Sequence, residues 1–281
     1  MTASNPALRV AVAQLAPTTD AGVNRDRIVE LVEAAHERGA RLVVLPEEAM
    51  LLAGELDESV RADTVARDWP LFLGLLSRLA LENGTWIIAG GYEPSGDAEH
   101  PARPHNSIAV VNPRGELVDV YRKLHLYDAF SYRESDYVTG GTELPPVVLI
   151  EGVAVGLVNC YDIRFPELSR DLVSRGADVL AVSAAWVAGP RKEDHWTTLV
   201  RARAIENTCW VVAASTSVPD CVGTSMIVDP LGIVRAELPP RGDELAVIDV
   251  TLDRIAEVRE TLPSLANRRL DTRVTVQENF A

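Results

Sequence analysis

The sequence predicts an α/β fold in which mixed β-sheets are covered by helices. Apolar runs of strand length alternate with segments that carry apolar residues at helical spacing. Other apolar runs occur in pairs around short polar turns, a pattern typical of β-hairpins. Hydrophobic residues make up 47% of the 281 residues, enough for the core of one large α/β domain.

The first half of the chain alternates strands and helices. Residues 28, 31, 32 and 35 are apolar and share one helical face, and glycine follows each expected helix as a common stop signal. We expect strands over residues 8–14, 42–45 and 85–89, and helices over residues 24–37 and about 70–82.

Two expected hairpins resemble each other. Residues 112–115 (Asn-Pro-Arg-Gly) follow the apolar run 108–111, and residues 229–232 (Asp-Pro-Leu-Gly) follow the apolar run 226–228. Proline presets the first turn angle and glycine closes the turn. Because one such hairpin occurs in each half of the chain, the sequence indicates two similar sheets related by pseudo-symmetry.

The second half continues the alternation. Thr251 can cap a terminal helix. We expect a hairpin of strands 147–150 and 153–158, strands over 179–183, 210–214 and 245–250, and helices over 166–174, 192–207 and 251–260. Residues 263–281 are polar and lack periodicity, so we expect a C-terminal arm on a single domain that spans residues 1–281.

Charge and cysteine usage narrow the function classes. The net charge of −14 argues against nucleic acid or an anionic membrane surface as the main partner, although a local Arg or Lys can still bind an anionic small molecule. Cys160, Cys209 and Cys221 form no disulfide framework, which favours a reducing cytoplasm. Neither a signal peptide nor an apolar run of membrane-spanning length is expected.

Three chemically active side chains follow expected strands directly. Glu47 comes after the run 42–45, Lys123 follows the second strand of the first hairpin, and Cys160 ends the run that begins at Val153. Ligands collect outside the carboxyl ends of strands in open α/β sheets. Since a helix is expected to begin just after Cys160, its thiol has reason to be a thiolate nucleophile.

A carboxylate, an ammonium and a thiol form a sensible set for acyl transfer. Glu47 can take the thiol proton as general base and later protonate a leaving amine. Lys123 and the backbone N–H of Tyr161 are suited to hold the oxyanion. Glu48 is the alternative base, but the position directly after proline favours Glu47.

The three motifs together resemble the nitrilase (carbon–nitrogen hydrolase) superfamily over about residues 7–270. The matching segments are residues 45–47 (Leu-Pro-Glu), 121–126 and 159–168. The resemblance implies a Glu–Lys–Cys triad and a four-layer α-β-β-α sandwich with two mixed sheets. We expect no cofactor, and an assembly that is a homodimer paired through helices or a higher homo-oligomer. It also implies that Glu134 is a second glutamate that positions the lysine. Two neighbouring carboxylates tend to raise one pKa, which suits an acid/base role.

Within the superfamily, residues 160–166, 195–196 and 201–207 look like the Nit-type amidases, which cut ω-amides of small dicarboxylates or deaminated glutathione. Residues 127–130 depart from the commoner loop after the lysine motif. The expected substrate-binding residues are Tyr127, Tyr161, Arg164 and Trp186. Arg164 can hold a substrate carboxylate bidentately, or serve equally well in a structural salt bridge.

Other functions fit part of the pattern. A nitrile or a carbamoyl compound can use the same triad, and a non-catalytic redox-sensing or binding protein can use Cys160 alone. A lone cysteine at a strand end is usually a core residue. His125 and His195 lack metal-like spacing, and the glycine pairs 90–91 and 140–141 lack the flanks of a phosphate loop, so neither a metal nor a nucleotide is expected.

Overall fold

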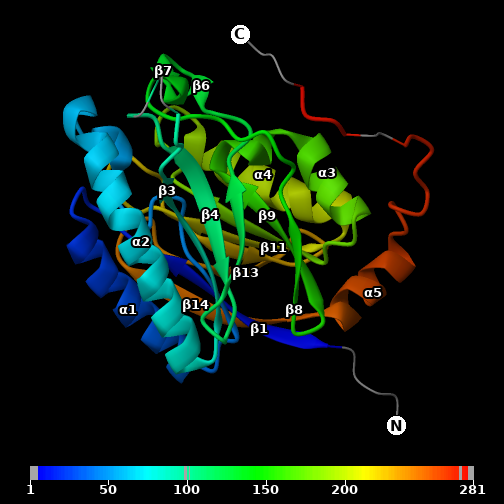
Figure 1. Cartoon of the computed structure of the whole chain (residues 1–281). Coiled ribbons are helices and arrows are strands. Elements are labelled where there is room, and N and C mark those ends of the chain that lie inside the picture. The colour runs from blue at the N-terminus through cyan, green and yellow to red at the C-terminus, as the bar shows by residue number, and fades with distance from the viewer. Residues whose placement is uncertain (1–5, 98–99, 101, 272–273, 278–281) are drawn as a thin grey trace.

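The structure, a computed structural model, describes residues 6–97, 100, 102–271 and 274–277. Two six-stranded mixed sheets pack face to face, and helices cover the outer face of each sheet (Figure 1). The predicted α/β class and the four-layer α-β-β-α sandwich are therefore confirmed.

The two sheets have related strand orders, β14-β1-β2-β3-β4-β5 and β13-β12-β11-β10-β9-β8. The strands of the first sheet are β1 (Ala7–Gln14), β2 (Leu42–Val44), β3 (Trp86–Glu93), β4 (His105–Val111), β5 (Leu117–Arg122) and β14 (Glu244–Thr251). Those of the second sheet are β8 (Val147–Ile150), β9 (Val153–Asn159), β10 (Val179–Ala184), β11 (Trp210–Ser215), β12 (Met226–Val228) and β13 (Val234–Glu237).

The helices cover the sheets and the remaining strands form a small separate hairpin, β6 (Asp128–Ala129) with β7 (Tyr132–Arg133). The α-helices are α1 (Ala21–Glu37), α2 (Glu58–Asn83), α3 (Pro166–Ser174), α4 (Lys192–Asn207) and α5 (Leu252–Thr261). The short 3₁₀ helices are η1 (Ala53–Glu55), η2 (Glu134–Asp136) and η3 (Cys160–Arg164).

The expected pseudo-symmetry is present in the topology. Strands β1, β2 and β3 are parallel, as are β9, β10 and β11, and an antiparallel hairpin follows each set. The two similar turns also match: Asn112 Oδ1 accepts the Arg114 N–H at 2.8 Å, and Asp229 Oδ1 accepts the Leu231 N–H at 2.9 Å. Each half of the chain thus builds its sheet with the same local chemistry.

Three apolar layers hold the sandwich together. On β1, Leu8, Val10 and Val12 point between the two sheets, whereas Ala11 and Ala13 pack under α1 and α2. A third layer joins the second sheet to α3 and α4. Since both faces of each sheet are covered, the central strands are continuous apolar runs rather than alternating ones.

The predicted start of the second helix at Pro70 is wrong. Helix α2 begins at Glu58 and continues through Pro70. Proline removes a helical hydrogen bond and favours a first turn. Here the buried side chains of Val65 and Trp69 precede the proline and pack with Phe72 in the same apolar layer. Their burial outweighs the local signal, a common tertiary override of helix propensity.

The two sheets are joined at the end where the loops after β2 and β10 meet. Ser183 Oγ donates to the Leu45 carbonyl at 2.8 Å, linking one sheet to the other. Two glycines allow neighbouring backbone segments to pack closely against the residues that follow β2 and end β5. A Cβ on Gly90 would lie 2.2 Å from the Glu47 carbonyl oxygen, and one on Gly141 would lie 2.3 Å from that of Arg122. The glycine pairs noted in the sequence therefore make room for neighbouring loops.

The described part of the C-terminal arm contacts the second half of the sandwich. Leu265 packs against the apolar layer under α3 and α4, and Arg268 Nη1 donates to Ser174 Oγ at 3.1 Å. Residues 272–273 and 278–281 of the expected arm lie outside the described residues.

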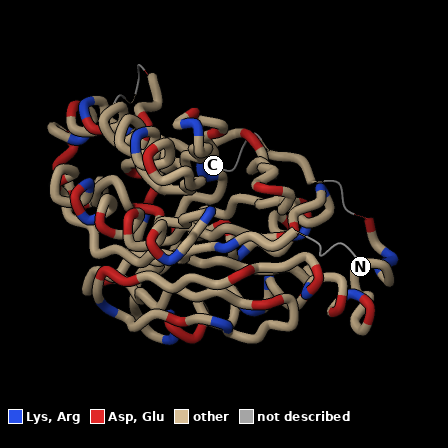
Figure 2. Tube along the Cα trace, turned by 90° about the horizontal axis from the view of Figure 1, so that it is seen from below, with Lys and Arg blue, Asp and Glu red and all other residues tan. Residues whose placement is uncertain are grey.

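Acidic and basic residues are interspersed along the chain trace (Figure 2). Many of them pair, as in the bidentate contact of Arg9 with Asp249 at 2.7 and 2.8 Å. Within the described ranges, no helix is both long and apolar enough to cross a membrane.

We predict that Gly90→Ala destabilises the protein by about 1–3 kcal/mol, because the new methyl group meets backbone atoms of the Glu47 loop. Gly74→Ala is the matched control. A Cβ added at Gly74, in α2, would meet no neighbouring atom within 4 Å, so we expect stabilisation by about 0.5–1 kcal/mol. Urea unfolding measures both changes. A Gly90→Ala variant as stable as the wild type would show that the loop moves without cost.

Candidate active site

Four predicted residues meet in one open cavity. Glu47, Lys123, Glu134 and Cys160 all line a space of about 500 Å³ at the shared end of the two sheets. The loops that follow β2, β5 and β9 supply three of them, and η2 supplies Glu134. Strand topology brings these residues together although 76 positions separate Glu47 from Lys123.

Cys160 occupies a strained turn between β9 and α3. Its φ of 43° lies in the left-handed region, which a residue with a side chain adopts at a cost of about 1–3 kcal/mol. The residue is 7% exposed and is the first of η3. Strain at a buried thiol facing a cavity is typical of a functional position rather than of ordinary core packing.

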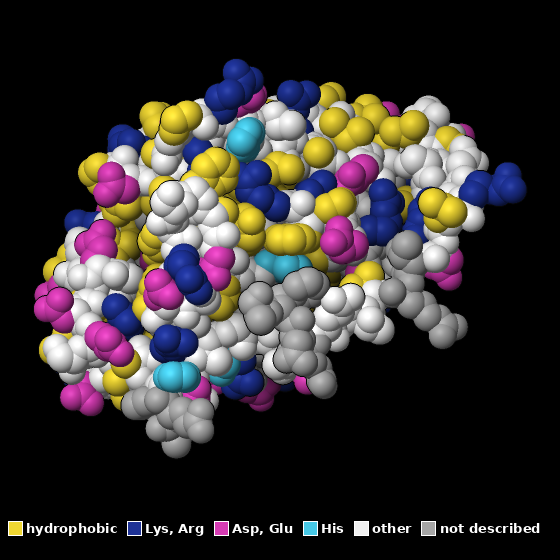
Figure 3. Space-filling view, turned by 90° about the horizontal axis from the view of Figure 1, so that it is seen from above, with side chains coloured by type: hydrophobic (Ala, Val, Ile, Leu, Met, Phe, Trp, Pro, Cys, Tyr) yellow, Lys and Arg dark blue, Asp and Glu magenta, His cyan; other side chains and the backbone are white. Residues whose placement is uncertain are grey.

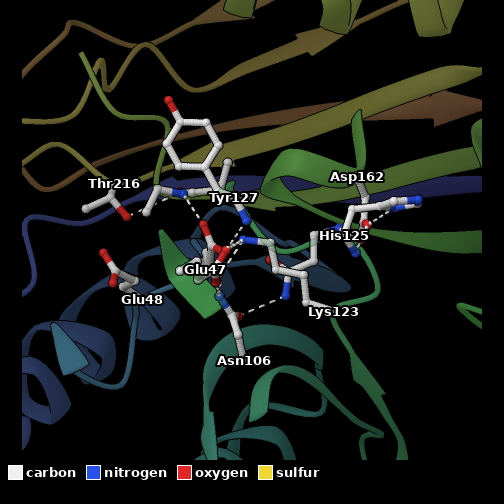
Figure 4. Close-up of polar contacts among 12 residues, drawn as sticks. Glu47, Glu48, Asn106, Lys123, His125, Tyr127, Asp162 and Thr216 are labelled. Atoms are coloured by element: carbon white, nitrogen blue, oxygen red, sulfur yellow. Dashed lines mark hydrogen bonds and ion pairs between the residues drawn. The ribbon is translucent and has the colours of Figure 1, made fainter. Parts of the chain in front are cut away.

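Asp162 holds this turn against the segment that carries the candidate lysine. Its carboxylate accepts the Asn159 N–H at 3.2 Å and the Tyr121 hydroxyl at 2.8 Å. It also accepts the His125 N–H at 3.1 Å and lies 2.7 Å from His125 Nδ1 (Figure 4). One buried carboxylate thereby fixes two loops that are far apart in the sequence.

Lys123 lies between two carboxylates. Its Nζ donates to Glu47 Oε1 at 2.7 Å and to Glu134 Oε2 at 2.8 Å (Figure 4), and all three side chains are almost fully buried. Backbone N–H groups add further hydrogen bonds: Ala185 donates to Glu47 Oε2 at 2.7 Å, and Tyr127 donates at 2.6 Å to the Glu134 Oε2 that also accepts from Lys123. The resulting cluster is rigid and well hydrogen-bonded.

Asn106 is a member of this cluster that the sequence analysis missed. Its Nδ2 donates to Glu47 Oε1 at 2.7 Å and to Glu134 Oε1 at 2.9 Å. Its Oδ1 accepts from Asn159 Nδ2 at 3.0 Å. The other site residues follow strands, but β4 runs antiparallel to β3, so the beginning of β4 rather than its end lies at this end of the sheet. The sequence signal for Asn106 is its polar side chain near the start of β4, a strand that is otherwise mostly apolar.

The electrostatics differ from the expected preformed thiolate. Burial raises the pKa of the Cys160 thiol well above its ordinary value, and the negative charge of Glu47 adds to the shift, while Lys123 opposes it. The thiol and Glu47 line the same cavity. Cys160 is therefore protonated at rest, because burial and the negative charge of Glu47 both disfavour the thiolate.

Glu47 and Lys123 each stabilise the charged form of the other. Burial alone would raise the pKa of Glu47, but the charge and hydrogen bond of Lys123 lower it below its ordinary value. Burial would lower the pKa of Lys123, but Glu134 and Glu47 raise it well above its ordinary value. The expected upward shift from paired carboxylates therefore does not occur at Glu47, because an ammonium lies between the pair.

The carboxyl group whose pKa is raised is that of Glu48. Burial and the charge of Glu47 raise the pKa of Glu48 to about 8, although the Tyr92 hydroxyl donates to Glu48 Oε1 at 2.9 Å. Glu48 lines the cavity but lies to one side of the cluster around Lys123 (Figure 4). It is thus a mainly protonated acid at neutral pH.

The predicted substrate-binding residues divide into two groups. Tyr127, Tyr161 and Trp186 line the cavity. Arg164 does not line it: its guanidinium lies over the Trp186 ring at 4.7 Å, and its Nη2 is 3.5 Å from His195 Nδ1. The cavity wall also contains residues that the sequence analysis did not select: Tyr92, Tyr132, Tyr137, Ala185, Val187, Lys192 and Cys221.

The face above the cavity mixes apolar and basic surface. Figure 3 looks down on the end where the β6–β7 hairpin lies in Figure 1, and hydrophobic and basic side chains gather across its middle. In the described ranges, no group of three or more His, Cys, Asp or Glu side chains is arranged to hold a metal ion.

The sequence matches the carbon-nitrogen hydrolase family over residues 9–260, and the chain belongs to that family. It is accordingly a hydrolase that acts on carbon–nitrogen bonds other than peptide bonds. The resemblance to the nitrilase superfamily is confirmed.

Particular relatives include several amidases. The chain is 39% identical to a deaminated glutathione amidase of Escherichia coli O157:H7, over 92% of this chain and 97% of that protein. It is 37% identical to a deaminated glutathione amidase of Rattus norvegicus, over 93% of this chain and 82% of that protein.

Solved structures share the fold. The Caenorhabditis elegans NitFhit protein superposes with a TM-score of 0.87 at 31% identity, over 95% of this chain and 66% of that one. An amidase of Nesterenkonia sp. AN1 gives a TM-score of 0.76 at 25% identity, over 96% of this chain and 95% of that one. Its active-site cysteine there carries the acetamide moiety of fluoroacetamide.

We predict that Glu48→Gln stabilises the protein relative to the wild type as the pH rises. The folded-state pKa of about 8 lies above the ordinary value of 4.5, so the protonated carboxyl contributes stability below pH 4.5 that is lost as the pH rises through 8. The stability of the variant minus that of the wild type therefore increases by about 3–4 kcal/mol from pH 5 to pH 8. Urea unfolding at both pH values tests this, and a pH-independent difference would contradict it.

Proposed function

We propose that the chain is a cofactor-free amidase in which Cys160 is the nucleophile, Glu47 the general base and Lys123 the oxyanion partner. One observation carries the proposal: Glu47, which accepts a hydrogen bond from Lys123 Nζ at 2.7 Å, lines the same open cavity as the Cys160 thiol. The general base Glu47 and the oxyanion partner Lys123 thus lie in the same cavity as the nucleophile Cys160.

The first half of the reaction forms a thioester. Glu47 takes the thiol proton as the Cys160 sulfur attacks the amide carbon, which creates a C–S bond and an oxyanion. Lys123 and the Tyr161 backbone N–H stabilise that oxyanion. Glu47 returns the proton to the amide nitrogen, the C–N bond breaks, and ammonia or an amine leaves.

The second half regenerates the enzyme. Water enters, Glu47 accepts one of its protons, and the oxygen attacks the thioester carbon. A second oxyanion forms beside Lys123, the C–S bond breaks, and the proton on Glu47 returns to the Cys160 sulfur. Since burial raises the pKa of that thiol, the neutral form is restored readily and the carboxylic acid product leaves.

Glu134 and Asn106 position the reacting groups. Glu134 keeps Lys123 in place and charged through two contacts, at 2.8 and 3.1 Å. Asn106 joins the two carboxylates by its Nδ2.

The proposed substrates are ω-amides of small dicarboxylates or deaminated glutathione. The deaminated glutathione amidases among the relatives support this class, as do the Nit-type motifs. A nitrile or a carbamoyl compound is chemically compatible with the same triad. The redox-sensing alternative is disfavoured, because sensor thiols have low pKa values and the pKa of Cys160 is raised.

We also propose a single domain over residues 1–281, a homodimer paired through helices and a cytoplasmic location. The family resemblance supports the dimer. The three cysteines, all described as free thiols, support a reducing compartment.

We predict that Cys160→Ala abolishes ammonia release from glutaramate, succinamate and deaminated glutathione while the protein stays folded. Cys209→Ala is the matched control, because its buried thiol lies outside the cavity and carries no proposed role. Ammonia release and circular dichroism are measured for both variants, with carbamoyl compounds and nitriles added to the panel. Turnover by Cys160→Ala would refute the mechanism.

We predict a mass of twice 30.5 kDa for the purified protein in solution. Size-exclusion chromatography with light scattering, over a tenfold concentration range, checks this value. A monomer throughout that range would contradict the proposed dimer without bearing on the chemistry of Cys160.

A further inference from the structure

The cavity contains a second buried ammonium that the proposed mechanism does not use. Lys192, the first residue of α4, is only 5% exposed and lines the cavity together with Cys160. The chain has 27 basic residues, of which only Lys123 and Lys192 are lysine. Both line this cavity, whereas arginine supplies every other basic side chain.

The two lysines differ in their counter-ions. Lys123 contacts two carboxylates, whereas no carboxylate in the described part of the chain forms an ion pair with Lys192. The polar contact of Lys192 Nζ is a hydrogen bond to the Tyr127 hydroxyl at 2.9 Å. A buried charge is costly unless an opposite charge compensates it. Lys192 is therefore an uncompensated cation in the wall of the site.

Aromatic rings surround this ammonium. Its Nζ lies 4.7 Å from the centre of the Tyr127 ring, 4.9 Å from that of Trp186 and 5.0 Å from that of Phe130. Phe130 reaches it from the β6–β7 turn, where Phe130 and Ser131 both have positive φ. Cation–π contacts hold the ammonium in place but leave its net charge uncancelled.

A second cation raises the positive potential here. The Arg164 guanidinium lies over the same Trp186 ring, and its buried Nε has no hydrogen-bond partner. Burial lowers the pKa of Lys192, and the charge of Arg164 lowers it further. An anion bound beside Lys192 would offset both effects, since it supplies the missing opposite charge.

We propose that Lys192 binds an anionic group of the substrate, so that the enzyme selects amides whose far end carries a carboxylate. Arg164 adds positive potential from behind Trp186. This inference rests on the proposed amidase function. The alternative role for Lys192 is purely structural: it would pin the β6–β7 hairpin over the cavity without contacting substrate.

Paired substrates separate these roles. Glutaramate carries a carboxylate, and glutaramide has the same chain with a neutral amide in its place. We expect the wild type to prefer glutaramate in kcat/KM, and Lys192→Met to lower that preference about 10–100-fold, mainly through KM, because a charge-assisted contact is lost. Lys192→Arg should keep most of the preference. Arg191→Met is the matched control, since Arg191 is exposed and pairs with Asp194.

Binding is measured independently of turnover. With only two lysines, protein labelled with ¹³C at lysine Cε gives two side-chain signals by NMR. We expect glutarate to shift the signal that disappears in Lys192→Met, with saturation, and to bind that variant at least tenfold more weakly by calorimetry.

The outcomes are distinct. Equal losses for glutaramate and glutaramide in Lys192→Met, together with a Lys192 signal that glutarate leaves unchanged, would overturn the inference in favour of the structural role. A wild type without preference for glutaramate would overturn it too. Absence of turnover on every amide, with glutarate still bound through Lys192, would instead refute the proposed function and leave the anion site standing.

Discussion

The buried contact of Lys123 with Glu47 and Glu134 is the constraint on which the rest of the site depends. Three charges removed from water are tolerated only when each is paired and hydrogen-bonded. Asn106 and the N–H groups of Ala185 and Tyr127 supply the remaining hydrogen bonds. These donors come from different loops and strands, so the cluster fixes the end of the sandwich as well as the chemistry of the thiol.

The sandwich makes such a cluster possible because both sheets present loops at the same end. Gly90 and Gly141 let the backbones of neighbouring loops approach closely, and Asp162 joins the turn at Cys160 to the loop after β5. The thiol is protonated at rest, since burial and the charge of Glu47 both raise its pKa. The proposed mechanism accordingly depends on proton transfer within the cavity rather than on a thiolate present at rest.

The cavity separates two uses of positive charge. Lys123 is neutralised by its carboxylates and is suited to stabilise a charge that appears only during the reaction. Lys192 keeps an uncompensated charge inside an aromatic cage and is suited to attract a charge that the substrate carries permanently. In a chain with a net charge of −14, the two lysines thus place positive charge locally in the cavity wall.

The sequence by itself determined the class of mixed sheets covered by helices and the positions of Glu47, Lys123 and Cys160 after strands, because apolar periodicity and the residues that end each run are local properties. The number of layers came from the family resemblance alone. The bounds of α3 and α4 also followed from local spacing. Only the tertiary structure decided the start of α2, the place of Asn106, the pKa of Cys160 and the surroundings of Lys192. Each of these depends on atoms contributed by distant segments, through packing, antiparallel strand direction and burial of charge, which spacing along the chain does not encode.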